Sequence, residues 1–300
     1  MSTMPGVSAL YLACIAIWGS TWLAITFQLG AVPPAVSVLY RFALAALLLF
    51  AYCGMRGLAL RFAARQHAAL AVQGALMYSI GYVFVYYAET LVVSGLVSVG
   101  FSLSPFLNML AVRVFLGTPM SARVALGGAL GALGVGLVFW PQVRSLGGDR
   151  AALAGIGFTA AAVAAHTVAT VVATRNTRIG VPIWQALAWG MLYGTVCSLG
   201  IVLLAGQPLA FDKTASYVAS LLYLAVLGSV VAFACYLRLL ETIGPARAGY
   251  IGVMVPIVAL MLSAAFEGFR WQASTWLGVA LSLAGNVLMR PASGRKHVAA

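Results

Sequence analysis

Hydrophobic residues fill the chain in runs of about 20 residues, and short polar or basic joints separate them. A helix needs about 20 apolar residues to cross the hydrocarbon core of a bilayer, so each run predicts a membrane-spanning helix. The ten predicted helices cover residues 7–29, 35–55, 68–88, 91–116, 123–140, 151–174, 182–205, 216–237, 246–266 and 274–289. The pattern therefore predicts an all-α membrane protein with ten transmembrane helices.

One long pattern occurs twice, at residues 89–141 and again at 241–291. The matched positions are Glu89 with Glu241, Thr90 with Thr242, Pro105 with Pro256, Phe115 with Phe266, Gly117 with Gly268, Gly127 with Gly278 and Gly134 with Gly285. Each half holds five predicted helices, an odd number, so the second half must cross the membrane in the opposite sense. The sequence thus predicts two inverted five-helix repeats, residues 1–146 and 147–300, an arrangement common in secondary transporters.

Composition and charge agree with a membrane protein. The chain is 63% hydrophobic and 7% charged, whereas a soluble domain carries about 25% charged residues. The net charge of +12 is scattered between apolar runs and forms no patch with interleaved aromatics, which argues against a nucleic-acid partner. The lipid bilayer is the expected surrounding.

The basic residues predict the orientation. One set of joints holds Arg56, Arg61, Arg65, Arg123, Arg175, Arg178, Arg238, Arg247, Arg290, Arg295 and Lys296. The other set holds only Arg144, Arg150, Lys213 and Arg270, together with Glu89, Asp149, Asp212 and Glu267. Because positive joints stay in the cytoplasm, both termini are expected there. The N-terminus has no basic region and no cleavage motif, so the first apolar run is expected to be retained.

The sequence shows no arrangement typical of an enzyme or a metalloprotein. The cysteines lie inside apolar runs without metal-ligand spacing, and we interpret them as small buried residues: Cys14, Cys53, Cys197 and Cys235. No nucleotide-binding loop, catalytic triad or carboxylate pair is found. We therefore predict no enzymatic activity, no cofactor and no metal site.

Aromatic side chains give the first candidates for a binding site. Tyr78, Tyr82 and Tyr86 recur every four residues and share one helix face. A tyrosine at a helix end is usually an interfacial anchor, but Tyr82 lies too deep for that role. Its hydroxyl needs a partner or water, so Tyr78 and Tyr82 are predicted to face a cavity. Tyr86 is expected at the membrane interface.

His166 is the only histidine inside an apolar run, which makes it a functional candidate. The alternative is a neutral imidazole bonded to a neighbouring helix. The repeat offset places it near the position of Trp18, beside Thr21. The predicted substrate cavity comprises Trp18, Thr21, Tyr78, Tyr82, Ser102, His166 and Met254.

Pro105 and Pro256 match across the repeat and fall in the middle of their predicted helices. Proline has no N–H for the carbonyl four residues earlier, at Phe101 and Gly252, so each bends its helix. We predict paired hinges at Pro105, Pro256 and Gly252, with a simple packing kink as the alternative.

Charged residues complete the candidates. Arg41 is about two turns inside its helix, and we expect its long side chain to reach the outer surface. This structural role is favoured over substrate binding. Glu89, Glu241 and Glu267 are expected near the interfaces, so we predict weak or no obligatory proton coupling.

Several motifs together resemble the drug/metabolite transporter superfamily, in particular its EamA-type ten-helix branch. They are Trp18-Gly19-Ser20, Pro34, Arg41-Phe42, Glu89-Thr90 before Pro105, Glu241 before Pro256, Phe266-Glu267-Gly268, Gly285 and Pro291. One position departs from the family, because its usual glutamate at the end of the fourth helix is Leu116 here.

The aromatic, nearly uncharged interior is most similar to the YddG-type amino-acid exporters. This resemblance implies a central cavity between the first, third, fourth, sixth, eighth and ninth helices. It also implies export of neutral and aromatic amino acids or similar small metabolites by alternating access, in a bacterial-type cytoplasmic (inner) membrane. Multidrug or other metabolite efflux and a non-transporting scaffold are the alternatives.

Overall fold

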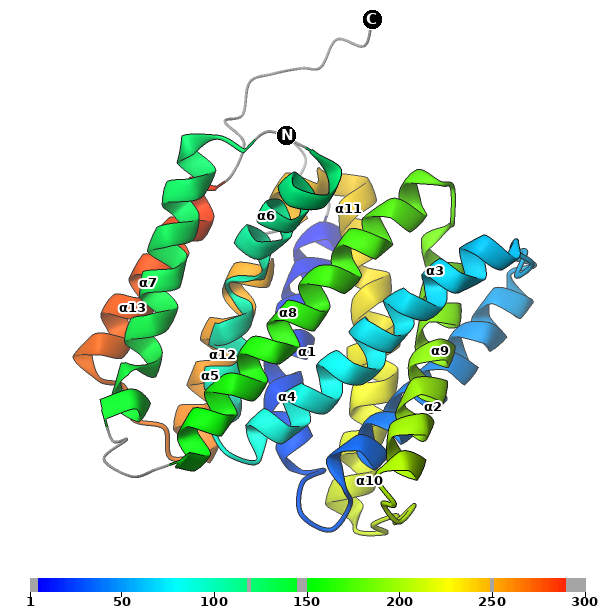
Figure 1. Cartoon of the computed structure of the whole chain (residues 1–300), viewed down its shortest axis with the longest axis horizontal. Helices are drawn as coiled ribbons and strands as arrows, with labels where there is room; N and C mark the ends of the chain where they lie inside the picture. The colour runs from blue at the N-terminus through cyan, green and yellow to red at the C-terminus, as the bar shows by residue number, and fades with distance from the viewer. Residues whose placement is uncertain (1–4, 118–119, 145–149, 249–250, 290–300) are drawn as a thin grey trace, which may run out of the picture.

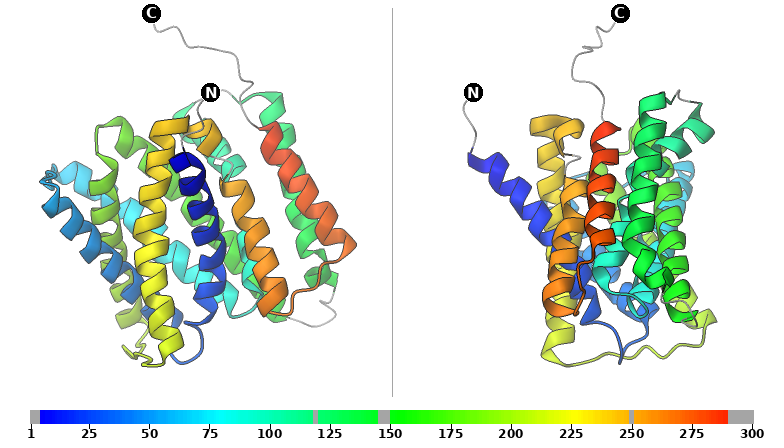
Figure 2. Two further views of the ribbon diagram at one scale, coloured as in Figure 1. Left: turned by 180° about the vertical axis from the view of Figure 1, so that it is seen from behind. Right: turned by 90° about the vertical axis from the view of Figure 1, so that its left-hand side faces the viewer.

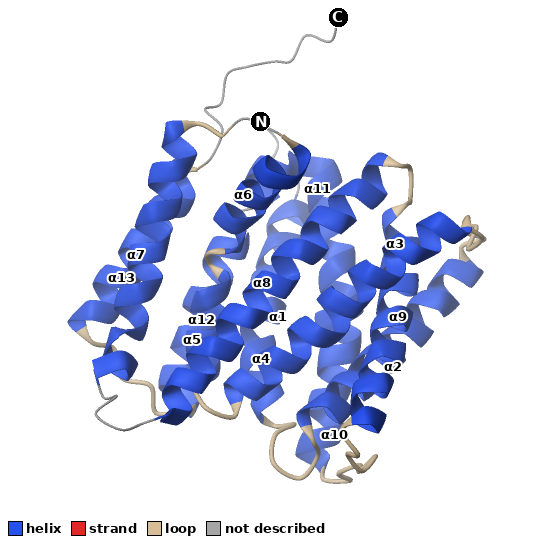
Figure 3. Ribbon diagram, viewed as in Figure 1, coloured by secondary structure: helices blue, strands red, loops and turns tan. Residues whose placement is uncertain are grey.

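The computed structural model describes residues 5–117, 120–144, 150–248 and 251–289. Within these residues every regular element is helical and no strand is formed (Figure 3). The helices form one bundle in which the start of the first and the end of the last lie at the same end (Figure 1, Figure 2). The predicted boundary between the repeats, at residues 146 and 147, lies outside the described residues, as does Pro291.

The elements follow the hydrophobic runs closely. Residues 5–144 contain α1 (Pro5–Thr26), α2 (Pro34–Met55), α3 (Ala64–Ala75), the π-helical η1 (Leu76–Ile80), α4 (Gly81–Glu89), α5 (Ser94–Phe101), α6 (Ser104–Leu116) and α7 (Ala122–Arg144). Residues 150–288 contain α8 (Arg150–Arg178), α9 (Ile183–Leu204), α10 (Ala215–Leu222), the π-helical η2 (Tyr223–Val231), α11 (Ala232–Ala248), α12 (Ile251–Phe266) and α13 (Ala273–Leu288).

Eight continuous or nearly continuous helical stretches in the described chain are long and apolar enough to cross a membrane. They are Gly6–Thr26, Pro34–Met55, Ala64–Glu89, Ser94–Phe115, Ala122–Pro141, Arg150–Arg178, Ile183–Leu204 and Ala215–Gly244. Two further apolar helices, α12 and α13, have 16 residues each. α6 and α12 are both followed by a glycine with a left-handed φ, 69° at Gly117 and 70° at Gly268, a conformation that favours glycine and ends a helix.

The matched prolines have different surroundings. The stretch containing Pro105 is broken, because α5 ends at Phe101 and α6 starts at Ser104 with Pro105 in its first turn. A first turn needs no N–H donor, so proline is favoured there. Pro256 instead lies within the continuous α12. The prediction of two mid-helix kinks is therefore corrected at Pro105, which begins a new helix after a break.

Helices from the two parts of the chain pack against each other: α2 on α9, α5 on α12, α7 on α13, α4 on α8, and α1 on α11 and α12. The contact between α7 and α13 depends on small residues. A Cβ added to Gly134 would lie 2.5 Å from the carbonyl oxygen of Gly278. Glycine lets two backbones approach this closely, which is typical of membrane helix pairs.

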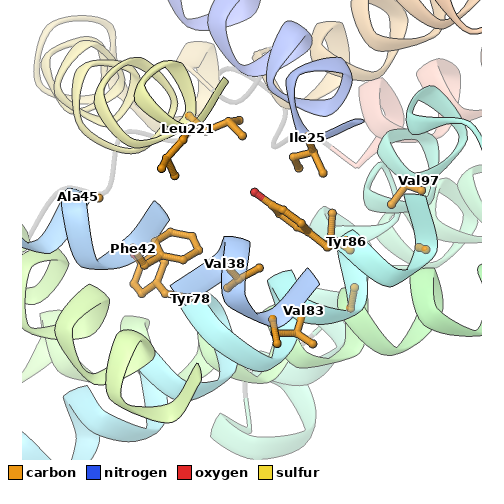
Figure 4. Packing of buried hydrophobic residues seen from close by; sticks show 14 of the residues in the cluster. Ile25, Val38, Phe42, Ala45, Tyr78, Val83, Tyr86, Val97 and Leu221 are labelled. Carbon is orange, nitrogen blue, oxygen red and sulfur yellow. The ribbon is translucent and has the colours of Figure 1, made fainter. Parts of the chain in front are cut away.

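Buried aromatic residues fill the space between α2, α4 and their neighbours. Figure 4 shows Phe42 beside Tyr78, with ring centroids 5.4 Å apart, and Tyr86 extending towards Ile25. The Tyr86 hydroxyl donates a 2.7 Å hydrogen bond to Gln28 Oε1, and its side chain is fully buried. Tyr86 is therefore buried within the protein and does not contact the lipid headgroups as an interfacial anchor would.

Candidate functional site: a central cavity

A cavity of about 320 Å³ lies between α1, α4, α5, α6, α8, α11 and α12, and α2 contributes one side chain to it. Its aromatic lining consists of Trp18, Trp22, Tyr82, Phe101 and Phe233. Its polar lining consists of Thr21, Arg41, Ser98, Ser104, Asn108 and His166. A second cavity, of about 330 Å³, lies among the joints after α4 and α12 and includes none of the predicted site residues.

The structure brings most of the predicted site residues into this central cavity. Its walls include Trp18, Thr21, Tyr82, His166, Pro105, Gly252 and Pro256. The whole described lining comes from the first, third, fourth, sixth, eighth and ninth hydrophobic runs, together with Arg41 of α2. Three other predicted cavity residues lie elsewhere.

Tyr78 and Tyr82 both pack against the ring of Phe42, with centroids 5.4 and 4.9 Å away, but only Tyr82 reaches the central cavity. Tyr78 is 2% exposed and packs against α9, where Gly190 and Gly194 leave room for its ring. Tyr82 remains in the cavity wall. The sequence-based expectation that both tyrosines face one cavity is corrected for Tyr78.

Ser102 and Met254 also lie outside the central cavity. Ser102 ends α5 and faces a small space beside α13, where its carbonyl oxygen accepts a 3.3 Å hydrogen bond from Asn286 Nδ2. Met254 is 39% exposed on the surface of α12. It is two positions from both Gly252 and Pro256, and a two-residue step rotates about 200° around a helix. Its side chain therefore points away from the cavity that these two residues line.

The aromatic walls are held by ring contacts and by one indole hydrogen bond. Trp18 Nε1 donates to the carbonyl oxygen of Gly228 in η2 at 3.2 Å, and its ring centroid is 5.3 Å from that of Phe233. Trp22 lies 5.2 Å from Phe101 across the same space. These contacts fix large apolar faces from α1, α5 and α11 around the cavity.

His166 lies between two of these rings, 5.3 Å from Tyr82 and 5.0 Å from Phe101. Its Nδ1 is 2.9 Å from the carbonyl oxygen of Ala162 in the same helix. A carbonyl can only accept, so Nδ1 donates and Nε2 is the acceptor of a neutral ring. The bond that orients His166 therefore comes from its own helix. No group of three His, Cys, Asp or Glu residues suited to a metal ion occurs in the described part of the chain.

Arg41 does not reach the outer surface, because its side chain is 2% exposed and enters the cavity wall. Its guanidinium carbon lies 4.6 Å above the Tyr82 ring and 5.1 Å from the centre of the Phe42 ring. Its Nε donates to Ser229 Oγ at 3.3 Å. The expectation of a surface role is wrong. Ser37 and Ala45, four residues to either side of Arg41, are both fully buried on the same helix face, but no feature of the sequence marks this face as the interior one.

Three polar lining residues were not among the predicted site. Ser98, Ser104 and Asn108 each have a buried side-chain oxygen without a hydrogen-bond partner. Such atoms are usually satisfied by a ligand or by water when they face a cavity. Serine and asparagine are common in packed membrane helices, so the sequence alone does not identify these three residues as part of a site. They are identified by their common position in the cavity wall.

The acidic residues near this region lie outside the cavity lining. Glu267 accepts hydrogen bonds at the start of α5 from the N–H of Ser94 at 3.0 Å and from Ser94 Oγ at 2.5 Å. Ser263 Oγ also donates to Glu267. Glu89 is 7% exposed, and neither of its carboxylate oxygens has a hydrogen-bond partner. The described cavity lining thus contains a cation and no carboxylate.

Known proteins match the chain along nearly its whole length. The model of the EamA-like transporter family matches residues 4–140 and again 153–290. The uncharacterized inner membrane transporter YedA of Escherichia coli K12 is 27% identical over 295 residues, covering 95% of this chain and 90% of that protein. Protein PecM of Dickeya dadantii is 26% identical over 261 residues, 86% of this chain and 82% of PecM. One crystal structure has the same fold, with a TM-score of 0.68 at 19% identity, covering 94% of this chain and 95% of that one.

Proposed function

Because the chain belongs to the EamA-like transporter family, we propose that it is a secondary transporter exporting neutral and aromatic amino acids or similar small metabolites. The observation that carries this proposal is the central cavity. Its volume of about 320 Å³ falls within the range of about 300–1,000 Å³ usual for small-molecule sites. Five Trp, Tyr and Phe side chains offer apolar faces, while hydroxyl, amide and guanidinium groups suit a zwitterion.

The YddG-type amino-acid exporters remain the proposed subtype. The support is the chemistry of the lining, which combines aromatic rings with few charges. A site for large cationic drugs would favour acidic groups, and the described lining has none.

We further propose ten membrane spans in two inverted repeats, residues 1–146 and 147–300, with α12 and α13 as the ninth and tenth spans. The twofold match of the family model supports two repeats. The helix pairs support them too, because α2 on α9, α5 on α12 and α7 on α13 join corresponding spans. Exchanging the two repeats also turns the contact of α1 with α11 into the contact of α8 with α4, and both contacts occur.

The joints between helices support the inversion. In Figure 1 the joint of α2 with α3 lies at the upper right, whereas the corresponding joint of α9 with α10 lies at the bottom. The ends of α6 and α7 that face each other lie at the top, and the joint of α12 with α13 lies at the lower left. Corresponding joints thus occupy opposite ends of the bundle.

The proposed location is the cytoplasmic (inner) membrane, with both termini in the cytoplasm. The similarity to YedA, named as an inner membrane transporter, supports the location. The end of the bundle where α1 begins and α13 ends also carries most of the described basic joints, such as Arg61 and Arg123. Basic joints remain in the cytoplasm, which supports the orientation.

Alternating access would use the broken stretch α5–α6 and the continuous α12, which face each other across the cavity. Pro105, Gly252 and Pro256 line this cavity and are the proposed hinges. Pro105 cannot donate to the carbonyl oxygen of Phe101, so the backbone at this break lacks one helical hydrogen bond. A missing bond lowers the resistance of the segment to bending.

Flux through liposomes containing the purified protein tests the proposal. We expect saturable exchange of radiolabelled phenylalanine, methionine, threonine or tryptophan that protein-free liposomes do not show. Absence of flux for all four would overturn the amino-acid assignment. Stronger competition by unrelated drugs than by amino acids would instead indicate multidrug efflux.

A further inference from the structure

Arg41 is the only permanently charged side chain in the described lining of the central cavity. It comes from α2, which contributes no other residue to the walls. A charged side chain inside a membrane protein is costly, and it usually lies on a substrate pathway or beside a partner. The surroundings of Arg41 therefore decide between these two roles.

The guanidinium is held in place but is not neutralised. Tyr82 and Phe42 support its plane, and Ser229 accepts from Nε. Ser229 Oγ itself donates to the carbonyl oxygen of Leu224 at 2.9 Å, which fixes its lone pairs towards Arg41. The guanidinium nitrogen Nη1, in contrast to Nε, is buried and has no hydrogen-bond partner.

No carboxylate in the described chain forms an ion pair with Arg41. The ion pair found there joins Arg238 with Glu241 at the protein surface. Glu89 interacts electrostatically with Arg41, but its oxygens make no hydrogen bond. A buried cation without a bonded counter-charge is unfavourable, so an anion that enters the cavity would be stabilised there.

Resting on the transport function proposed above, we propose that Arg41 binds the carboxylate of the substrate and restricts the cavity to small molecules that carry one. A guanidinium presents parallel N–H donors that match the two oxygens of a carboxylate. The start of α6 at Ser104 also lines the cavity, and its positive helix end favours the same charge. The apolar part of such a substrate would lie against Trp18, Trp22 and Phe101.

The competing role for Arg41 is purely structural, as a link from α2 to η2 and α4. The two roles differ in substrate selectivity. If the role is structural, replacing Arg41 lowers the stability of the protein and weakens the binding of all substrates to the same extent. A carboxylate-binding arginine distinguishes an amino acid from its amide, which has nearly the same shape but an uncharged carboxamide in place of the carboxylate.

The test measures how phenylalanine and phenylalaninamide compete with radiolabelled phenylalanine for the purified full-length protein in detergent. We expect the amide to bind at least about tenfold more weakly to the wild type, since a hydrogen-bonded charge is lost. Arg41→Gln should weaken the binding of phenylalanine by a similar factor and remove the preference for phenylalanine over phenylalaninamide. Arg41→Lys should keep part of this preference. Arg113→Gln is the matched control, because it removes an exposed arginine from α6.

The outcomes separate the two proposals. If the wild type binds no phenylalanine, the proposed function fails. If the wild type binds phenylalanine and phenylalaninamide equally, the proposed function stands but the proposed role of Arg41 fails. The same conclusion follows if Arg41→Gln keeps the full preference for phenylalanine. Thermal unfolding of each variant shows whether it is folded. Should Arg41→Gln not fold, the reduced preference expected of Arg41→Lys and the wild-type comparison still decide the question.

Discussion

Arg41 and Glu89 are both buried ionisable residues, yet their surroundings differ. Arg41 lines the cavity, its Nε donates to Ser229, and its buried Nη1 has no hydrogen-bond partner. Glu89 lies outside the cavity lining and its oxygens have no hydrogen-bond partner. A carboxylate without bonds gains little from being charged in such a place. At the scale of single residues, the described lining holds a cation and no carboxylate, which supports the proposed binding of an anionic group without an accompanying proton carrier.

Transport is accordingly expected to proceed without a pH gradient. Glu89→Gln preserves the size of the side chain and removes its charge, so we expect flux within about twofold of the wild type. The measurement is uptake of radiolabelled phenylalanine into proteoliposomes with equal or unequal pH across the membrane. Glu241→Gln, at an exposed ion pair, serves as the control. A flux that needs the gradient and disappears in Glu89→Gln would identify Glu89 as a proton carrier.

His166 and Met254 test the corrected boundaries of the site. His166→Ala removes a ring that contacts Tyr82 and Phe101 in the cavity wall. We expect its kcat/KM for export to fall about fivefold or more, corresponding to about 1 kcal/mol of lost interaction. Met254→Ala changes an exposed side chain on the far side of α12 and should leave kcat/KM unchanged. Equal losses in the two variants would show that the cavity is not the transport site.

Individual helices show how the cavity is supported. Glu267, just after α12, ties this helix to the start of α5 through Ser94, and Ser263 Oγ accepts from the N–H of Gly95 at 2.8 Å. The matched position in the first repeat is Leu116, which has no carboxylate. The two repeats therefore do not hold their helix ends by the same interaction.

This difference predicts a measurable effect on stability. Glu267→Gln keeps the shape but weakens charge-assisted hydrogen bonds to Ser94, at an expected cost of about 1–2 kcal/mol. We expect the melting temperature of the purified protein to fall by several degrees. Glu241→Gln should leave it unchanged, since exposed ion pairs contribute little. A variant Glu267→Gln as stable as the wild type would mean that the contact between α5 and α12 depends on packing alone.

The hydrophobic pattern predicted where helices occur, but not their internal irregularities. Runs of apolar residues identify the spans because length and composition alone decide membrane insertion. The π-helical segments η1 and η2 and the break before Ser104 depend on which neighbours accept the freed backbone groups. Gly228 in η2, for example, gives its carbonyl to Trp18 of a distant helix. The position of Tyr78 depends on Gly190 and Gly194 of α9, which leave room for its side chain, so spacing within its own run could not place it.

Arg41 shows the same limit at the cavity. Its depth in the run permitted either a surface or an interior position, because a long side chain can reach several ångströms along a helix. The decision rests on Ser229 and Tyr82, which lie far away in the sequence. Tyr82, Trp18 and His166 were identified because polar or amphipathic groups deep in an apolar run require a reason. The partners that make a site remain a property of the folded chain.

The molecule as a whole combines a repeated sequence with opposite placement of its joints. Such an arrangement gives a cavity two related sets of walls, and an exchange of their conformations would open it to either side of the membrane. The pairing of corresponding helices, such as α2 with α9, supports this symmetry. Glu267 makes hydrogen bonds that Leu116, at the matched position, cannot make, so the proposed symmetry would be approximate and its two openings would differ in stability.

Inversion makes a direct prediction for labelling from each side of the membrane. In a variant whose cysteines are replaced by alanine, Arg61→Cys and Lys213→Cys place single thiols in corresponding exposed joints. Inverted repeats put these thiols on opposite sides, with Lys213→Cys outside because the more basic joints stay in the cytoplasm. An impermeant maleimide should therefore label Lys213→Cys in intact cells and Arg61→Cys only in inside-out vesicles. Arg270→Cys and Arg123→Cys form a second matched pair with the same expectation, and labelling of either pair from one side would exclude inversion.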